Sequence, residues 1–186
     1  MNFCSNCSHA VTSKIPAGDY LPRYVCESCS TIHYENPRII AGCIPEWEGR
    51  ILLCRRAIEP QRGLWTVPAG FMENGEAVQD AAAREAQEEA LADVEIGSLV
   101  SMVNVIRSHQ VHIIFRARLR NTNFGVGAES LEVALYDEAD IPWAQIAFLS
   151  VEFALRRYLE DRRAGRELAH FRDIDWQTGR VVVRDR

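Results

Sequence analysis

Two pairs of cysteines near the N-terminus constrain the fold of this chain more than any other feature of its sequence. Each pair has the spacing C-x2-C, and residues 8–25, 18 in all, separate them. Four thiolates at this spacing can converge tetrahedrally on one Zn²⁺ ion. The alternatives are unligated thiols or a redox pair, but two such pairs at this separation favour zinc. The predicted zinc ligands are Cys4, Cys7, Cys26 and Cys29.

The segment between the cysteine pairs cannot fold around a core of its own. It contains Pro16, Pro22 and few apolar residues, so the metal must supply much of its stability. His9 and His33 lie close to the pairs and could each replace a thiolate, but four cysteines already complete a structural site. We therefore expect a zinc ribbon over residues 1–35.

The rest of the chain has the composition of a globular domain. Its 186 residues suffice for one well-cored domain and a small appendage, and 47% hydrophobic with 25% charged residues is the balance of a soluble protein. No apolar run is long enough to span a bilayer, and the start lacks a secretory signal. We expect a cytoplasmic protein that does not bind membranes. A net charge of −5 also argues against general nucleic-acid binding.

The pattern of apolar residues predicts a mixed α/β domain over residues 36–165. Two strands flank a turn at residues 47–50, and the single cysteines within them, Cys43 and Cys54, are interpreted as core residues. Further elements are predicted as strands at 99–105, 111–119 and 131–136, a helix from Val151 to a stop at Gly165, and a tail over 166–186 in which Val181–Val183 could add an edge strand.

A helix with a small apolar face is predicted after the loop 69–75. Two glycines and an asparagine permit sharp turns in this loop, and Asn74 can cap the helix. Residues that repeat every four positions form a face able to pack closely on a sheet. These residues are Val78, Ala82, Ala86 and Ala90.

Three glutamates near the end of this helix point to metal chemistry. Glu85, Glu88 and Glu89 stand at i, i+3 and i+4, so their carboxylates share one side of the helix. Two such charges about 4 Å apart repel by about 4 kcal/mol near a protein surface, and the end of a helix disfavours anions further. A hard cation, Mg²⁺ or Mn²⁺, would offset this cost through oxygen ligands. The alternative is a solvated acidic face.

The loop and the helix together resemble the Nudix box. Gly70, five residues, Glu76, seven residues and the run Arg84–Glu89 match G-x5-E-x7-R-E-U-x-E-E-x-G-U over 23 positions. With the flanking ribbon and hairpin, the chain is similar to zinc-ribbon Nudix hydrolases almost end to end. The resemblance implies the Nudix α/β/α sandwich with a mixed β-sheet.

The same resemblance implies the metal ligands and the residues that hold the loop. Arg84 with Glu76 would fix the loop on the helix. Leu91 stands where the box has its last glycine, so the helix is expected to end differently, and Ala86 and Ala92 replace larger aliphatic residues. The implied ligands of Mg²⁺ or Mn²⁺ are Glu85, Glu88 and Glu89, helped by a carbonyl of Ala69 or Gly70.

The implied reaction is attack of water on one phosphorus of a nucleoside diphosphate derivative, which gives two monophosphate products. The base would be a box glutamate or a glutamate of the later segment 127–132, with Glu132 favoured and Glu129 as the alternative. Phe71 could stack an adenine or flavin ring and Arg55 could reach a phosphate, although such residues also serve as core or solvated side chains. The segment 127–132 looks closest to FAD and ADP-ribose pyrophosphatases, followed by NADH pyrophosphatases.

A different class of function is a metabolite-sensing regulator whose zinc ribbon binds nucleic acid. Only Lys14, Arg23 and Arg38 surround the ribbon, too few for a clustered basic face. A catalytically inactive scaffold is a third class, and the intact Arg84 and glutamates argue against it. The expected partner is therefore a nucleoside diphosphate-linked small molecule, and a homodimer is left open.

Overall fold

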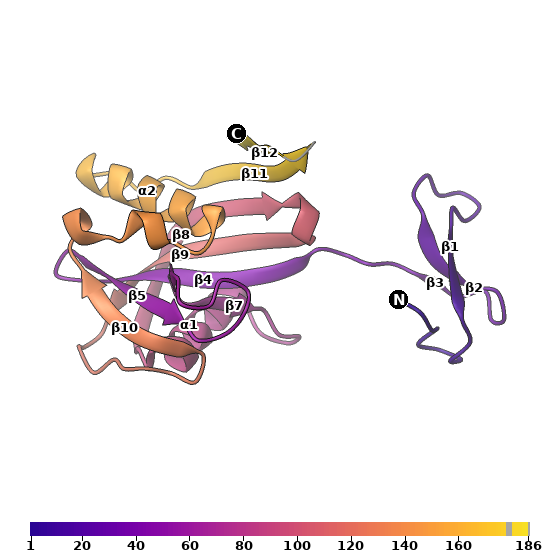
Figure 1. The fold of residues 1–186 in the computed structure, drawn as a ribbon, viewed down its shortest axis with the longest axis horizontal. Coiled ribbons are helices and arrows are strands. Elements are labelled where there is room, and N and C mark those ends of the chain that lie inside the picture. Colours follow the sequence, from indigo (N-terminus) through magenta and orange to yellow (C-terminus); the bar gives the residue numbers. More distant parts are fainter. Residues whose placement is uncertain (178–179, 186) are drawn as a thin grey trace. The chain divides into compact units, whose positions relative to one another are not determined.

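The computed structural model describes residues 1–177 and 180–185, and the chain divides into two compact units. The first unit is Met1–Pro37, and the second begins at Arg38. Three short strands of the first unit form an antiparallel sheet in the order β1-β2-β3 (Figure 1). Their bounds are β1 Val11–Lys14, β2 Arg23–Cys26 and β3 Ile32–His33.

The first unit has almost no hydrophobic core. Within residues 1–37, all of which the structure describes, the buried side chains are Cys4, Val25 and Cys26. Two of these three are predicted zinc ligands. The packed interior of this unit therefore consists largely of the cysteine cluster itself.

The second unit is built on one mixed sheet. In its described part the sheet has nine strands: β10-β5-β4-β9-β8-β11-β12 follow one another, β6 pairs with β5, and β7 pairs with β4. The β4–β9 and β8–β11 pairs are parallel, and the remaining pairs are antiparallel. The bounds are β4 Arg38–Trp47, β5 Arg50–Arg56, β6 Trp65–Thr66, β7 Ala69–Phe71, β8 Val94–Val105, β9 Gln110–Leu119, β10 Ser130–Tyr136, β11 His170–Gln177 and β12 Arg180–Asp185.

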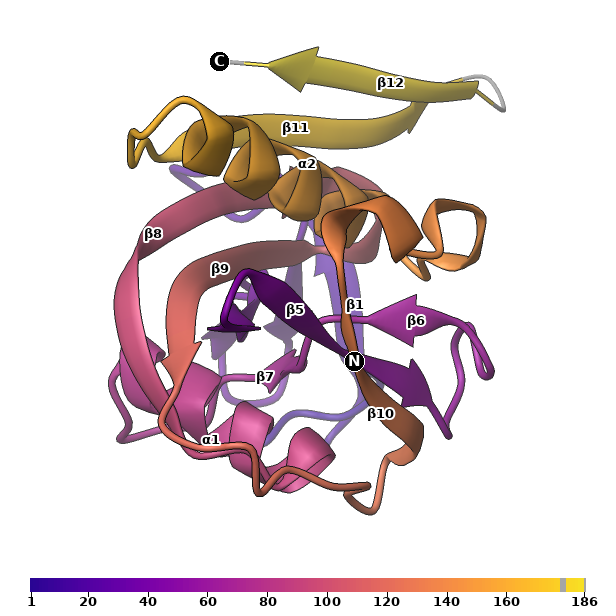
Figure 2. The same ribbon diagram turned by 90° about the vertical axis from the view of Figure 1, so that its left-hand side faces the viewer.

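Two helices cover opposite faces of this sheet, as Figure 2 shows. Because side chains alternate along a strand, β4 directs Ala41 and Cys43 into the cluster under α1 and Ile44 into the cluster under α2. This arrangement confirms the predicted α/β/α sandwich. The helices are α1 Val78–Ala90 and α2 Leu149–Arg163, with short 3-10 helices η1 Ile106–Ser108, η2 Glu138–Asp140 and η3 Trp143–Gln145.

The alanine face of α1 packs as its sequence predicts. Ala82, Ala86 and Ala90 are fully buried, and Val78 packs at the edge of the same cluster. Small side chains let the helix axis approach β4 closely, which brings the glutamates of α1 near the sheet. The same cluster buries Cys43 and Cys54, which confirms that both are core residues.

The predicted cap of α1 is wrong. The helix begins at Val78 after Ala77, and no side chain caps it. Asn74 lies in a turn with Gly75, whose φ is +94°, and the chain needs these residues to close the loop before it enters the helix. The Glu76 carboxylate closes that loop instead, because it accepts a hydrogen bond from the Glu73 amide at 2.6 Å.

The end of α1 differs from the expectation as well. Leu91 adopts the left-handed conformation, with φ of 49° and ψ of 28°. Its amide donates to the Gln87 carbonyl at 3.0 Å, and the next amide, of Ala92, donates to the Ala86 carbonyl at 3.1 Å. The bond from Leu91 to Gln87 is that of the αL C-cap motif, in which glycine is the usual residue. The helix therefore ends as a glycine would end it, although leucine stands there.

The other predicted elements are present with small changes of extent. The turn at 47–50 joins β4 and β5, and Glu48 and Gly49 have positive φ angles there. The strand predicted at 99–105 begins earlier, at Val94, and residues 181–183 lie in β12 beside β11. No helix of the described residues combines the length and apolar character required to cross a membrane.

Candidate active site and cysteine cluster

Arg84 on α1 ties the loop before the helix to the helix itself. Its guanidinium donates to both carboxylate oxygens of Glu76, at 2.9 and 3.1 Å, and to the Phe71 carbonyl at 3.1 Å. It also donates to Glu85 at 2.7 Å and to Glu88 at 2.9 Å. The hydrogen bonds that Glu76 accepts, first from Arg84 and then from the Glu73 amide, lower its pKa. One cation thus holds the loop and two of the three helix glutamates in place.

Glu85 and Glu89 are buried carboxylates with few hydrogen-bond donors. They are only 8% and 6% exposed, and Glu89 accepts one hydrogen bond, from the Ala69 amide at 3.3 Å. Burial raises the pKa of Glu89 to about 8, and burial also raises the pKa of Glu85 against the opposing effect of Arg84. Oxygen ligands whose charge the protein leaves poorly compensated fit a hard divalent cation.

The sheet approaches Glu85 so closely that Gly70 has no room for a side chain. A Cβ on Gly70 would lie 2.4 Å from Oε2 of Glu85. Gly70 and Ala69 belong to β7, which pairs with β4 at Ala41 and Gly42. The glycine therefore lets the Glu85 carboxylate lie directly against the backbone of β7.

A second close backbone contact, between the loop before β10 and the end of α1, brings Glu129 toward the two buried glutamates. The Gly125 amide donates to the Ala90 carbonyl at 2.8 Å, and the Gly127 amide donates to the Glu89 carbonyl at 3.1 Å. A Cβ on Gly127 would lie 1.8 Å from the Glu88 carbonyl oxygen. The loop before β10 thus packs on the end of α1, and the charge of Glu129 contributes to the raised pKa of Glu89.

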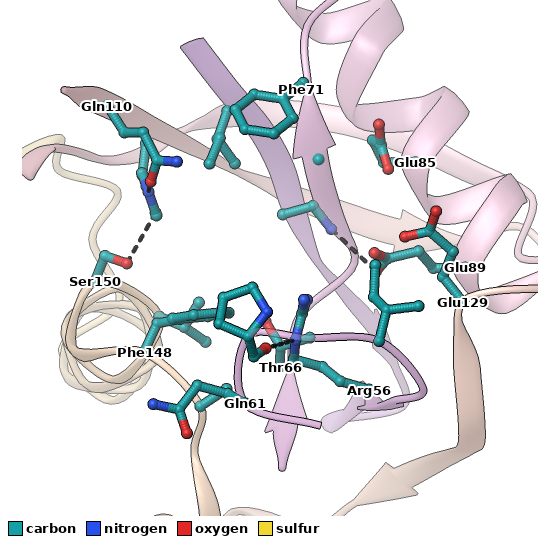
Figure 3. A pocket seen from close by; sticks show the side chains of 18 of the residues that line it. Arg56, Gln61, Thr66, Phe71, Glu85, Glu89, Gln110, Glu129, Phe148 and Ser150 are labelled. Atoms are coloured by element: carbon teal, nitrogen blue, oxygen red, sulfur yellow. Dashed lines mark hydrogen bonds between the residues drawn. The ribbon is translucent and has the colours of Figure 1, made fainter. Parts of the chain in front are cut away.

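Glu85, Glu89 and Glu129 line a cavity of about 920 Å³, a size at the upper end for small-molecule sites. Figure 3 shows Glu85, Glu89 and Glu129 at one end, with Gln110 and Ser150 at the other. Phe71 and Phe148 also line it, and the guanidinium of Arg56 lies 5.1 Å from the Phe148 ring centre. The predicted residues Arg84, Glu88, Ala69 and Gly70 line it as well.

Arg55 and Glu132 are not brought to this cavity. They face each other across the β5–β10 pair, with 3.6 Å between Nη1 and Oε2, and neither is among the residues that line the cavity. Their neighbours Arg56 and Glu129 line it instead. The glycines at 125 and 127 were the available signal for Glu129, since closely spaced glycines often mark a close backbone approach.

The four predicted zinc ligands lie together in the first unit. Their sulfur atoms are 3.7 Å apart for Cys4 and Cys29, 3.4 Å for Cys7 and Cys26, and 3.3 Å for Cys7 and Cys29. Four sulfurs at a Zn–S distance of about 2.3 Å would be about 3.8 Å apart in a tetrahedron, so the cluster fits zinc.

The cysteines are the one set of three or more metal-ligating side chains gathered about a single point in the described chain. The helix glutamates are less tightly gathered, and Arg84 holds Glu88, whose side chain is 58% exposed. His33 lies beside the cysteine cluster, with its Nε2 3.3 Å from the Cys4 sulfur, whereas the His9 ring lies 3.0 Å from the Cys7 carbonyl oxygen.

Two protein-family models match the chain. The NUDIX domain model matches residues 36–159, more than half of the chain, and the Nudix N-terminal zinc ribbon model matches residues 2–35. The boundary between these matches falls beside the boundary of the two compact units, after Pro37.

Individual relatives carry related names. The ADP-ribose pyrophosphatase of Methanocaldococcus jannaschii is 28% identical over 113 residues, which are 59% of this chain and 67% of the relative. The human 8-oxo-dGDP phosphatase NUDT18 is 30% identical over 141 residues; the match spans 74% of this chain but only 40% of the human protein. A crystal structure of a NUDIX hydrolase from Nitrosomonas europaea superposes with a TM-score of 0.89 at 52% identity, over 92% of this chain and 97% of that one.

Proposed function

Because this chain belongs to the NUDIX family of hydrolases and carries the family's N-terminal zinc ribbon, we propose that it hydrolyses the diphosphate linkage of a dinucleotide-type substrate. The proposed substrates are FAD, ADP-ribose and NADH, and the proposed cofactor is Mg²⁺ or Mn²⁺. Each product would carry one phosphate. The relative named ADP-ribose pyrophosphatase supports this class of substrate.

The observation that carries the proposal is the pair of buried carboxylates at one end of a large cavity. Glu89 accepts one hydrogen bond, from the Ala69 amide, and Glu85 shares the Arg84 guanidinium with Glu76 and Glu88, so the protein alone compensates this buried pair only in part. A substrate diphosphate is itself an anion, and a divalent cation is what would hold both anions together. The cavity of about 920 Å³ leaves room for the rest of a dinucleotide.

The proposed metal ligands are Glu85, Glu88 and Glu89, with a backbone carbonyl of Ala69 or Gly70. When bound, the metal would lower the pKa of water and neutralise charge on the phosphates. For Glu88 to bind the metal, its carboxylate must give up the hydrogen bond that it accepts from Arg84 at 2.9 Å. Arg84 keeps Glu76 and the Phe71 carbonyl as partners in that case, so the loop stays fixed.

We propose Glu129 as the general base in place of Glu132. Glu129 lines the cavity beside Glu85 and Glu89, whereas Glu132 is paired with Arg55 outside it. In the proposed step a water oxygen bonds to one phosphorus as the bridging P–O bond breaks. Glu129 accepts a proton from that water, and the leaving phosphate departs as the second product.

In the N-terminal unit we propose one structural Zn²⁺ held by Cys4, Cys7, Cys26 and Cys29. A closed set of four thiolates leaves no open position for a substrate, so this ion would stabilise the fold and take no part in hydrolysis. Elemental analysis of purified protein should find about one zinc per chain. Folded, active protein without zinc would contradict this assignment.

The test of the enzymatic proposal is a turnover screen of the purified chain with Mg²⁺ and with Mn²⁺. The panel contains FAD, ADP-ribose, NADH, a nucleotide sugar and 8-oxo-dGDP, and mass spectrometry in oxygen-18 water identifies the phosphorus that is attacked. Hydrolysis of a dinucleotide to two monophosphates is the expected result. If every compound is inert while a specific DNA fragment binds with strong salt dependence, the regulator alternative is correct.

A further inference from the structure

Three polar side chains form a hydrogen-bonded chain at the end of the cavity opposite the glutamates. Ser150 Oγ lies 2.9 Å from Nδ1 of His112, and Nε2 of His112 lies 3.1 Å from Oε1 of Gln110. His112 and Ser150 are 7% and 2% exposed. The proposed hydrolysis uses none of the three, and His112 and Ser150 are 38 positions apart in the sequence.

The direction of these hydrogen bonds follows from the charge of His112. Burial lowers the pKa of His112 to about 4, so the imidazole is neutral at neutral pH and carries one N–H. Because the Gln110 carbonyl can only accept, Nε2 of His112 donates to it, and Nδ1 accepts the Ser150 hydroxyl proton. The Gln110 amide nitrogen then keeps both of its protons, and no described residue accepts them. It is a donor presented to the cavity that Gln110 lines.

Apolar side chains lie in a row next to this donor. Ile40 pairs with Phe71 on one side and with His112 on the other, so the three residues form one row across β7, β4 and β9. Val105 also lines this end. Arg38 packs against the Phe71 ring, 4.7 Å from its centre, and holds the ring in place. None of the residues Phe71, Ile40, His112, Gln110, Ser150 and Val105 carries a charge at neutral pH.

We propose that Gln110, His112, Ser150 and Phe71 form a subsite for an uncharged heteroaromatic ring of the substrate. The Gln110 amide donates to a ring nitrogen or ring carbonyl of the ligand, and Phe71 stacks on the ring. His112 and Ser150 are positioning residues that fix which side of the Gln110 amide faces the ligand. This assignment rests on the proposed function, which places the diphosphate at the glutamates, roughly 10 Å or two strand spacings from His112.

The chemistry of the subsite selects against sugars and phosphates. The six residues named offer a phosphate no cation, and the Arg38 guanidinium beside them already lies over the Phe71 ring. A sugar would offer hydroxyl groups to an apolar row. A purine base and a flavin both present ring acceptors, so they share the chemistry that Gln110 would recognise. The experiment therefore uses one probe of each kind and one probe without a ring.

Gln110→Met is the central variant, because methionine keeps the length of the side chain and removes the donor. Binding of AMP, FMN and ribose 5-phosphate to the full-length protein is measured by titration calorimetry. We expect about a 10-fold loss of affinity for AMP or for FMN, the effect of one hydrogen bond, and less than a 2-fold change for ribose 5-phosphate. The ring that loses affinity is the ring that the subsite takes. Gln145→Met, an exposed glutamine outside the cavity, is the matched control.

Two results would overturn the subsite. In one, neither AMP nor FMN binding changes in Gln110→Met; in the other, ribose 5-phosphate loses as much affinity as they do, which would place a phosphate near the start of α2. Should the methionine variant melt at a lower temperature than the wild type, Gln110→Glu supplies the same test. Its carboxylate can still accept from His112 but cannot donate to a ring.

Kinetics separate this inference from the proposed function. For the hydrolysed dinucleotide, Gln110→Met should raise KM about 10-fold and leave kcat within 2-fold, whereas Ser150→Ala should raise KM less and Ser150→Thr should restore it. If no dinucleotide is hydrolysed but AMP or FMN binding depends on Gln110, the subsite stands and the proposed reaction fails. If hydrolysis occurs with a KM independent of Gln110 and Ser150, the reaction stands and the subsite fails.

Discussion

The N-terminal unit buries three side chains, whereas the catalytic unit packs two extended hydrophobic clusters on the two faces of its sheet. In the first unit two of the buried residues, Cys4 and Cys26, are proposed metal ligands, so the proposed metal site and the core are nearly the same thing. In the second unit Glu85 and Glu89 lie at the edge of a core that the alanines of α1 complete without them. Metal is thus expected to act on folding in one unit and on chemistry in the other.

The largest effect should follow from loss of a zinc ligand. Cys26→Ser should unfold residues 1–37, because structural zinc binding is worth about 10–16 kcal/mol in small zinc domains and their apolar core cannot replace it. The catalytic unit should keep its fold and its Mg²⁺-dependent turnover. Hydrogen exchange of the full-length variant would measure protection in each unit separately.

Two outcomes would break the comparison between the units. Wild-type protection of residues 1–37 in the serine variant would show a stable fold without metal. Loss of protection throughout the chain would show that the catalytic unit depends on the ribbon. Ser28→Ala, a change at an exposed position between Cys26 and Cys29, is the control and should alter neither unit.

The second effect should be on catalysis alone. Glu89→Gln should lower turnover by at least about 10²–10³-fold, the loss typical when a group that stabilises transition-state charge is removed. In metal-free protein the same change should raise the free energy of unfolding by about 1 kcal/mol, because it removes a buried carboxylate next to Glu85. Turnover assays and melting curves measure the two effects.

Addition of Mg²⁺ separates a metal site from an acidic surface. At a concentration of 100 times Kd, Mg²⁺ should stabilise the wild type by about 2.7 kcal/mol and the Glu89→Gln variant much less. Glu167→Gln, on an exposed residue, should respond to Mg²⁺ as the wild type does. Unchanged turnover in Glu89→Gln would overturn the site.

The sequence predicts local features of this site better than contacts between distant segments. The i, i+3, i+4 spacing puts Glu85, Glu88 and Glu89 on one side of α1, and all three line the cavity. The choice between Glu129 and Glu132 depends on Gly127 packing against the end of α1 and on a register shift between Ser130 and Glu132. Neither leaves a periodic signal.

The polar chain at the other end of the cavity shows the same limit. His112 lies on a strand whose alternation predicts only which face it occupies. Its partner Ser150 lies at the start of α2, and the contact forms only once α2 packs on the sheet. Sequence periodicity therefore predicts the layers, while the pairing of polar groups between layers requires the folded structure.

The third effect tests how the catalytic unit compensates a buried charge without metal. Asp161 on α2 is fully buried and accepts hydrogen bonds from Arg116, Arg166 and His170. Burial alone would raise the pKa of Asp161, but the bonds donated by His170 and Arg166 outweigh burial and hold this pKa at about 2. Asp161→Asn should cost about 2–4 kcal/mol, because it removes the anion that faces Arg116, whose side chain is only 12% exposed.

The pH dependence of this effect has a definite sign. The native pKa of Asp161 lies below the ordinary value of 3.8, so the native state binds fewer protons than the unfolded chain in that range. The contribution of Asp161 is fully present above about pH 4 and is lost as the pH falls toward about 2. Urea denaturation between pH 2 and 6 should show a stability difference between wild type and Asp161→Asn that shrinks with acid. A difference independent of pH would contradict the account.

The smallest effect concerns Leu91, the residue that ends α1. A non-glycine residue in the left-handed conformation costs about 1–2 kcal/mol, and glycine returns about 0.5–1 kcal/mol of this as extra entropy of the unfolded chain. Because the Leu91 side chain is 47% exposed, little packing is lost with it. Leu91→Gly should therefore stabilise the catalytic unit by about 0.5–1 kcal/mol, while Leu91→Ala, which keeps its Cβ, should not. Melting of metal-free protein measures the difference. If both variants are destabilised alike, packing of the leucine outweighs its backbone strain, and the end of α1 draws its stability from the side chain.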